Sequence, residues 1–187
     1  THPLQNTTYS IMFTQFHQIK RDTLATITLD KAAMVREIEC ATYKLASSTV
    51  PDESVRDNMQ VDVEESIDST LIVSFMDKRA AEIEEMLLAF SDDDASTDVD
   101  DSSDDSPTYV FKFAIEKKFK RNLKVASRYM HNYIVTGSIL DWHKANGSQY
   151  SLTNDNDMIV LKSKIVNLFR GEFVKGGYIP DMIHPTR

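Results

Sequence analysis

Basic side chains crowd one short segment of the chain, and their chemistry suits the binding of anions. Six of them fall between residues 117 and 128 of the 187-residue sequence: Lys117, Lys118, Lys120, Arg121, Lys124 and Arg128. Several Lys and Arg side chains in one place can neutralise the phosphates of a nucleic acid, with an affinity that falls steeply as salt is added. Aromatic residues nearby recur at helical spacing, which is typical of core anchors more than of a base-stacking platform. The basic helix expected over residues 112–128 is therefore a candidate contact surface for a nucleic acid or a protein partner.

An acidic run precedes this segment and dominates the charge of the chain. Residues 91–106 read SDDDASTDVDDSSDDS and hold eight aspartates and no basic residue, against a net charge of -8 for the whole sequence. From Pro107 onward, 13 Lys and Arg face 6 Asp and Glu. The run has too few apolar side chains to offset the entropy of ordering, and it lacks the Gly and Glu that an EF-hand loop requires. The sequence predicts a disordered acidic linker, which could compete with an anionic partner for the basic segment.

The residue types needed for catalysis or metal binding do not come together at a readable spacing. The histidines lie in separate segments: His2, His17, His131, His143 and His184. With one cysteine, Cys40, the sequence offers no cysteine-built zinc site and no intrachain disulfide. It contains neither a P-loop nor a dinucleotide-binding Gly motif. We therefore expect no catalytic, cofactor-binding or metal-binding residues, and no enzymatic activity.

Apolar residues recur every three or four positions along much of the chain, a spacing that predicts helices. Asp30 is a suitable cap for a helix over residues 31–47, and the strongest apolar stripe follows over residues 69–90: Ile72, Met76, Ala80, Ile83, Leu87 and Phe90. Further helices are predicted at 7–27, 51–63, 109–135, 139–144 and 157–170. Gly137 is expected to stop the helix of 109–135. No segment alternates clearly enough to predict a strand.

These patterns predict an all-α fold, a helical bundle of about six to eight helices with a disordered acidic loop. The parts would be an N-terminal helical part at 1–90, the acidic linker at 91–106 and a basic C-terminal helical part at 107–187, packed with the first as one domain. No apolar run approaches the ~18 residues of a membrane span, and nothing near Thr1 has the pattern of a signal peptide. One cysteine suits a reducing compartment. We expect an intracellular protein, nuclear or cytoplasmic, with no membrane partner.

Four short segments share their order with a known family. They are SVRDNM at 54–59, EIEEML at 82–87, LKSKIVNL at 161–168 and FRGEFVKGGYIPDMI at 169–183. This order resembles the central helical domain (domain II) of the TFIIS transcription elongation family, although an insertion holding the acidic run and the basic helix separates the second and third segments. The resemblance implies a module that docks on RNA polymerase, with candidate docking residues Lys162, Lys164 and Asn167. It implies nothing catalytic, because the family's cleavage-stimulating activity depends on a four-cysteine zinc ribbon.

Three functional hypotheses follow from the sequence. The leading one is a non-enzymatic helical module that docks a protein partner within a nuclear or viral transcription or gene-expression machine. The second makes the basic helix a nucleic-acid-binding surface, with the acidic loop as its competitor. The third is a viral structural or replication protein. Exposure of the basic helix separates the first two, because a basic helix packed inward would remove the nucleic-acid hypothesis and an exposed basic stripe would favour it.

Overall fold

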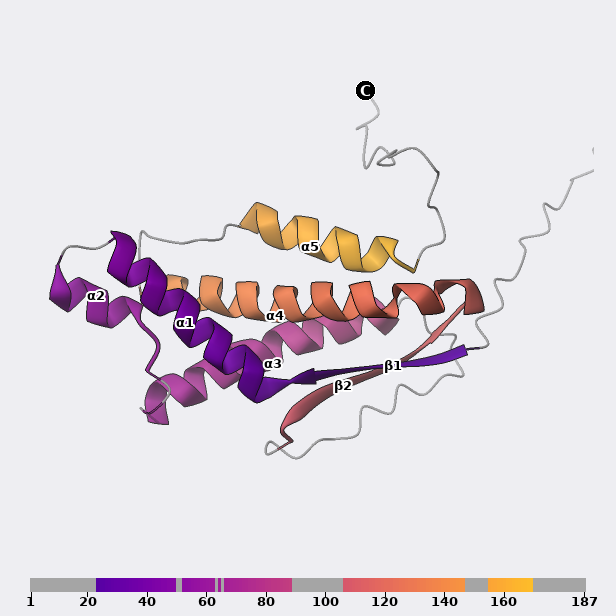
Figure 1. The fold of residues 1–187 in the computed structure, drawn as a ribbon, viewed down its shortest axis with the longest axis horizontal. Coiled ribbons are helices and arrows are strands. Elements are labelled where there is room, and N and C mark those ends of the chain that lie inside the picture. The colour runs from indigo at the N-terminus through magenta and orange to yellow at the C-terminus, as the bar shows by residue number, and fades with distance from the viewer. Residues whose placement is uncertain are drawn as a thin grey trace, which may run out of the picture.

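The computed structural model describes residues 23–49, 52–62, 64, 66–88, 106–146 and 155–169, and this part is mostly helical, as predicted. Its elements, in chain order, are β1 (Thr23–Asp30), α1 (Lys31–Thr49), α2 (Glu53–Met59), α3 (Ser66–Leu88), β2 (Thr108–Ile115), the 3-10 helix η1 (Lys117–Asn122), α4 (Leu123–Ala145) and α5 (Asp155–Asn167). Figure 1 shows α4 along the middle of the molecule, with α5 on one side and α3 and the two strands on the other. Nearly all of the predicted acidic loop, at 91–105, lies outside the described residues, as do residues 7–22 of the first predicted helix, Pro51 and Phe90.

Two strands form an antiparallel pair that the sequence analysis missed. Thr23 lies opposite Ile115 and Asp30 opposite Thr108. One face of the pair is buried against the helices: Ala25, Ile27, Leu29, Tyr109, Phe111, Phe113 and Ile115. The prediction of helix for 23–27 and 109–115 was therefore wrong, and the mostly helical described part of the chain also contains this small two-stranded sheet. Apolar residues four positions apart, such as Phe111 and Ile115, fit the two-residue period of a strand as well as the helical period. Their spacing therefore did not distinguish a strand from a helix.

Helix α1 begins and packs as its sequence predicts. The backbone N–H of Ala33 donates to Oδ1 of Asp30 at 2.9 Å, which caps the first turn. Met34, Ile38 and Leu45 are buried along one face. At Thr42 the hydroxyl donates to the carbonyl of Ile38 at 3.0 Å and accepts from the N–H of Val61 at 3.2 Å. This threonine therefore attaches the segment after α2 to α1.

Helices α3 and α4 form an antiparallel pair, and α4 continues well past its predicted end. The α3 stripe is buried as predicted, from Ile72 to Leu87. Gly137 does not stop α4, and the separate helix predicted at 139–144 is the second half of the same helix. A Cβ at Gly137 would lie 2.7 Å from Nε of Arg79 and 2.7 Å from Cε of Met158. Glycine is thus needed here for close packing of α3 and α5 on α4, not for a helix end.

A polar network inside the molecule fixes the register of this helix pair. Nη2 of Arg79 is 2.6 Å from Oδ1 of Asp141, and its Nη1 is 3.0 Å from Oε2 of Glu82. The hydroxyl of Tyr133 donates to the same Glu82 oxygen at 2.5 Å. Burial alone would lower the pKa of Arg79, but the charges and hydrogen bonds of Asp141 and Glu82 outweigh it and raise that pKa. Since a broken buried ion pair typically costs about 3–5 kcal/mol, the network favours this one alignment of α3 on α4.

Helix α5 covers α4 in the antiparallel sense and reaches the sheet at its end. Met158 and Ile165 are buried on its inner face. Just beyond the helix, the ring of Phe169 meets that of Phe113 edge to face, with centroids 5.2 Å apart. A single hydrophobic cluster takes residues from both sides of the acidic run. No helix within the described ranges is long and apolar enough to cross a membrane.

The burial of α3 yields a stability prediction with a control on the same helix. Ile83 is 0% exposed, whereas Leu88, five residues later, is 51% exposed. Ile83→Ala should lower the free energy of unfolding by about 2–5 kcal/mol because it removes buried methyl groups and leaves a cavity. Leu88→Ala should change it by less than about 0.5 kcal/mol. Urea denaturation of the three proteins measures both, and equal losses would show that α3 does not bury this face.

Candidate nucleic-acid interface

The 3-10 helix η1 exposes four of the predicted basic residues at once. Three residues complete each turn of such a helix, so positions three apart lie on the same side. Phe119 faces inward and is buried, and Nδ2 of Asn122, three residues later, donates to the carbonyl of Leu168 at 2.9 Å. The remaining two sides carry only cations, all exposed: Lys117, Lys118, Lys120 and Arg121.

The first turns of α4 extend this row of cations. Lys124 and Arg128 are both exposed and lie four residues apart, hence on one face of the helix. Ala126 and Met130 on the opposite face are fully buried. All six basic residues selected from the sequence are therefore exposed and follow one another along η1 and α4.

Helix α5 brings a seventh cation to the same place. Nζ of Lys164 lies 5.6 Å from the ring centroid of Tyr129, the residue after Arg128. One of the three family-like candidates, Lys164, thus lies beside the helix that carries Lys124 and Arg128, because α5 folds back along α4. We call the resulting group the basic surface, and it consists of Lys117, Lys118, Lys120, Arg121, Lys124, Arg128 and Lys164.

The other two family-like candidates lie near this group but outside it. Lys162 is exposed, about 200° around α5 from Lys164, since each helical residue turns by about 100°. Asn167 is exposed as well, and its Nδ2 donates to Oγ of Ser163 at 3.3 Å. The structure therefore does not join Lys162 and Asn167 to the row on η1 and α4.

Few negative charges lie in the stretch of chain that carries six of the seven cations. Glu116 is the one carboxylate in residues 116–131, and it pairs with Lys118 at 2.6 Å. Within the described part of the chain, the other six cations have no carboxylate partner. The first turn of α4 holds no acidic residue either. Since the N-terminal end of a helix carries a partial positive charge, these cations repel both one another and the helix end.

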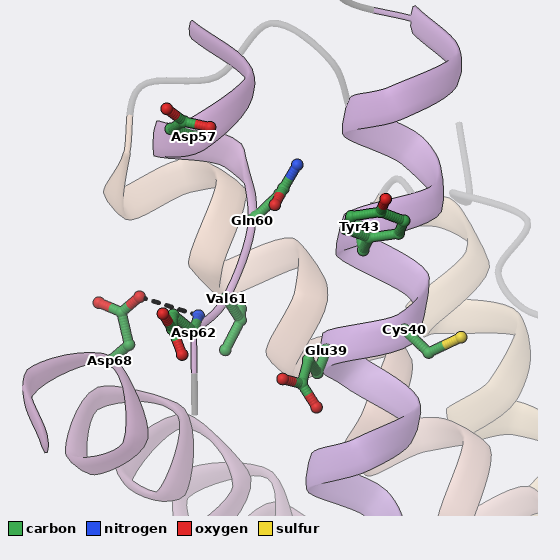
Figure 2. A pocket seen from close by; sticks show the side chains of 8 residues that line it. All are labelled: Glu39, Cys40, Tyr43, Asp57, Gln60, Val61, Asp62 and Asp68. Carbon is green, nitrogen blue, oxygen red and sulfur yellow. Dashed lines mark hydrogen bonds between the residues drawn. The ribbon is translucent and has the colours of Figure 1, made fainter. Parts of the chain in front are cut away.

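Several carboxylates of other elements lie near the opposite end of α4, whose own last turn is basic. There Nε1 of Trp142 donates to the carbonyl of Met59 at 3.1 Å, holding the end of α2 against α4. A cavity of about 590 Å³ opens beside α2, as Figure 2 shows, and is lined by Glu39, Cys40, Tyr43, Asp57, Gln60, Val61, Asp62 and Asp68. The N–H of Asp62 donates to Oδ2 of Asp68 at 3.1 Å across its rim. Among the described residues, no three His, Cys, Asp or Glu side chains are placed to hold a metal ion.

Comparison of the chain with protein-family models, with curated proteins and with solved structures finds no match. The resemblance to the TFIIS central domain therefore remains a prediction. Its first three segments lie in α2, in α3, and in α5 with the residue after it. Of the fourth, only Phe169 is described.

The charge arrangement of α4 predicts opposite effects at its two ends. Lys124→Gln removes repulsion at the positive end of the helix, so it should raise the melting temperature by about 1–3 °C at low ionic strength. Lys144 lies in the last turn and pairs with Asp155 at 2.7 Å, so Lys144→Gln should lower it by a similar amount. Both shifts should shrink near 1 M salt, where the Debye length is about 3 Å. Thermal unfolding followed by circular dichroism measures them, and a fall in stability for Lys124→Gln would contradict the repulsion.

Proposed function

We propose that the protein is a non-enzymatic binding module that contacts nucleic acid through the basic surface. The observation that carries this proposal is the exposure of all seven cations, six of them without a carboxylate partner in the described part of the chain. These six cations are held in place by helices and are not in ion pairs within the described part of the chain. An anion can therefore bind them without the free-energy cost of breaking an internal ion pair. Each phosphate that they neutralise releases a counterion, which provides affinity at low salt.

The sequence also favours a particular cellular process for this binding. The TFIIS-like order of segments favours a role in a transcription or gene-expression machine, nuclear or viral. Such a machine brings its components to nucleic acid, so a module in it can combine a phosphate contact with a protein contact. We place the protein, on this proposal, in the nucleus or cytoplasm.

The proposal predicts which substitutions weaken binding. Arg121→Gln/Lys124→Gln should reduce affinity for nucleic acid by about tenfold or more at low salt, because two phosphate contacts are lost. Lys44→Gln/Lys144→Gln makes the same change in net charge at exposed positions outside the basic surface, and should leave affinity within about twofold. Fluorescence anisotropy with a labelled oligonucleotide measures both. Equal losses in the two variants would show that net charge, not this surface, governs binding.

Protein docking, the leading hypothesis from sequence, is the second candidate. One observation favours α5 as the docking helix: Ile159 and Val160 are 61% and 50% exposed on it, close to Lys162. Exposed apolar side chains beside charged ones are common at protein interfaces. If no nucleic acid binds at low salt, while Ile159→Lys abolishes capture of RNA polymerase, this candidate replaces the first.

The acidic run supplies a further test of the basic surface. Arg79 with Asp141 and Glu82 with Tyr133 show that α3 runs antiparallel to α4, so α3 ends beside the first turns of α4 (Figure 1). The run begins three residues after Leu88, so the connection between it and the end of α3 is short. We propose that its eight aspartates compete with nucleic acid for the cations, at an effective concentration set by the short connection.

Replacing those eight aspartates by Asn keeps the chain length and removes the competitor. Affinity for nucleic acid at low salt should then rise by about tenfold, and the gain should fade as salt is added. A variant with the order of residues 91–105 shuffled keeps all eight charges and should bind like the parent protein. Affinity that stays unchanged in the Asn variant would remove the competitor hypothesis and leave the basic surface itself untouched.

A further inference from the structure

We infer that the nucleic acid recognised by the basic surface is double-stranded, an inference that rests on the proposed function. What the basic surface offers besides charge distinguishes single strands from double strands as its ligand. Proteins that bind single strands combine cations with aromatic side chains on which unpaired bases stack, and each stacked base contributes about 1–3 kcal/mol. Double strands keep their bases stacked on one another and present phosphates to the protein.

The aromatic rings at the basic surface are already occupied by the protein's own lysines. Phe119 is 7% exposed, and Nζ of Lys118 lies 4.9 Å from its ring centroid. Tyr129 is half-buried, with Nζ of Lys164 at 5.6 Å from its centroid. Within the described ranges, the one large aromatic residue that is well exposed is Tyr43, which lines the acidic cavity at the other end of α4. Among the described residues, the basic surface therefore has cations but no free ring for a base.

The spacing of the cations also suits a rigid lattice of phosphates. Lys117 and Arg128 are separated by about 20 Å along the helical axis, at about 2.0 Å per residue in η1 and about 1.5 Å in α4. A duplex carries one charge per ~1.7 Å of axis, so this length faces about six base pairs. A flexible single strand would have to be ordered along the row at a cost in conformational entropy, whereas a duplex is ordered before it binds.

Two of the side-chain amides near the basic surface are already hydrogen-bonded within the protein, whereas Asn132, one turn after Arg128 on α4, is exposed. Asn and Gln read base edges when their amides are available. Here Asn122 donates to the carbonyl of Leu168, and Asn167 donates to Ser163. Since Asn132 is a single exposed amide beside seven cations, we expect contacts mainly to phosphates, with a small dependence on base sequence.

The test is fluorescence anisotropy of the full chain with a duplex of about 20 base pairs, made as DNA and as RNA, and with each separated strand. At low salt each duplex should bind about tenfold tighter than its strands. The log-log salt slope should be about -4 to -5, for about five phosphates. Arg121→Gln/Lys124→Gln should reduce the slope by about two phosphate equivalents, and Tyr129→Leu should leave duplex affinity within about twofold.

The outcomes separate this inference from the function on which it rests. Single strands that bind as tightly as duplexes, or a large loss with Tyr129→Leu, would overturn the inference and leave the nucleic-acid proposal standing. Tight binding of one base sequence alone would overturn recognition by shape. Failure of every duplex and strand to bind at low salt would overturn both. Preference for DNA over RNA duplex, or the reverse, with strands weaker than either, would support the inference and define the helical form.

Discussion

The burial of α4 is the constraint on which the rest of the structure depends. In its second half nearly every side chain is buried, because α1, α3 and α5 all pack against it: Tyr133, Ile134, Val135, Gly137, Ser138, Ile139, Leu140, Asp141, Trp142 and His143. A helix surrounded in this way can keep a charged residue only if a partner is built for it, as Arg79 is for Asp141. Burial also lowers the pKa of His143, which disfavours the charged form of its ring. Most of the exposed charge on η1 and α4 consequently lies on η1 and the first turns of α4, and Lys144 is the exposed cation of the last turn.

This distribution of exposed charge explains why the cations gather at one end of α4. At that end they oppose the stability of their own helix. A first turn without acidic residues, preceded by four basic ones, is the reverse of the charge order that helices favour. The large core formed by α3, α4, α5 and the sheet tolerates this cost. Local choices that conflict with local stability concentrate at functional sites in natural proteins, which supports a binding role for the basic surface.

Sequence reasoning succeeded for elements whose structure depends on the residues of one helix and its helical repeat. Asp30 as a cap and the stripe of α3 were read correctly, since both depend on residues within one helix. It failed for the strand containing Phe111 and Phe113, where the spacing fits two periods and long-range pairing with β1 decides. It failed again at Gly137, because the close approach of Arg79 and Met158 depends on tertiary packing, which the local sequence does not show. The contact of Lys164 with Tyr129 could not be predicted from sequence either, because it depends on α5 packing antiparallel to α4.

The most direct measurement of the central claim is a map of the bound surface, obtained from backbone amide chemical shifts in NMR spectra as a nucleic acid duplex is added. We predict that the shifts concentrate in residues 117–128 and around Lys164, and that residues 53–68 beside the acidic cavity stay unchanged. Shifts centred on α2 and the start of α3, or spread evenly over the molecule, would contradict the assignment of the basic surface as the binding site.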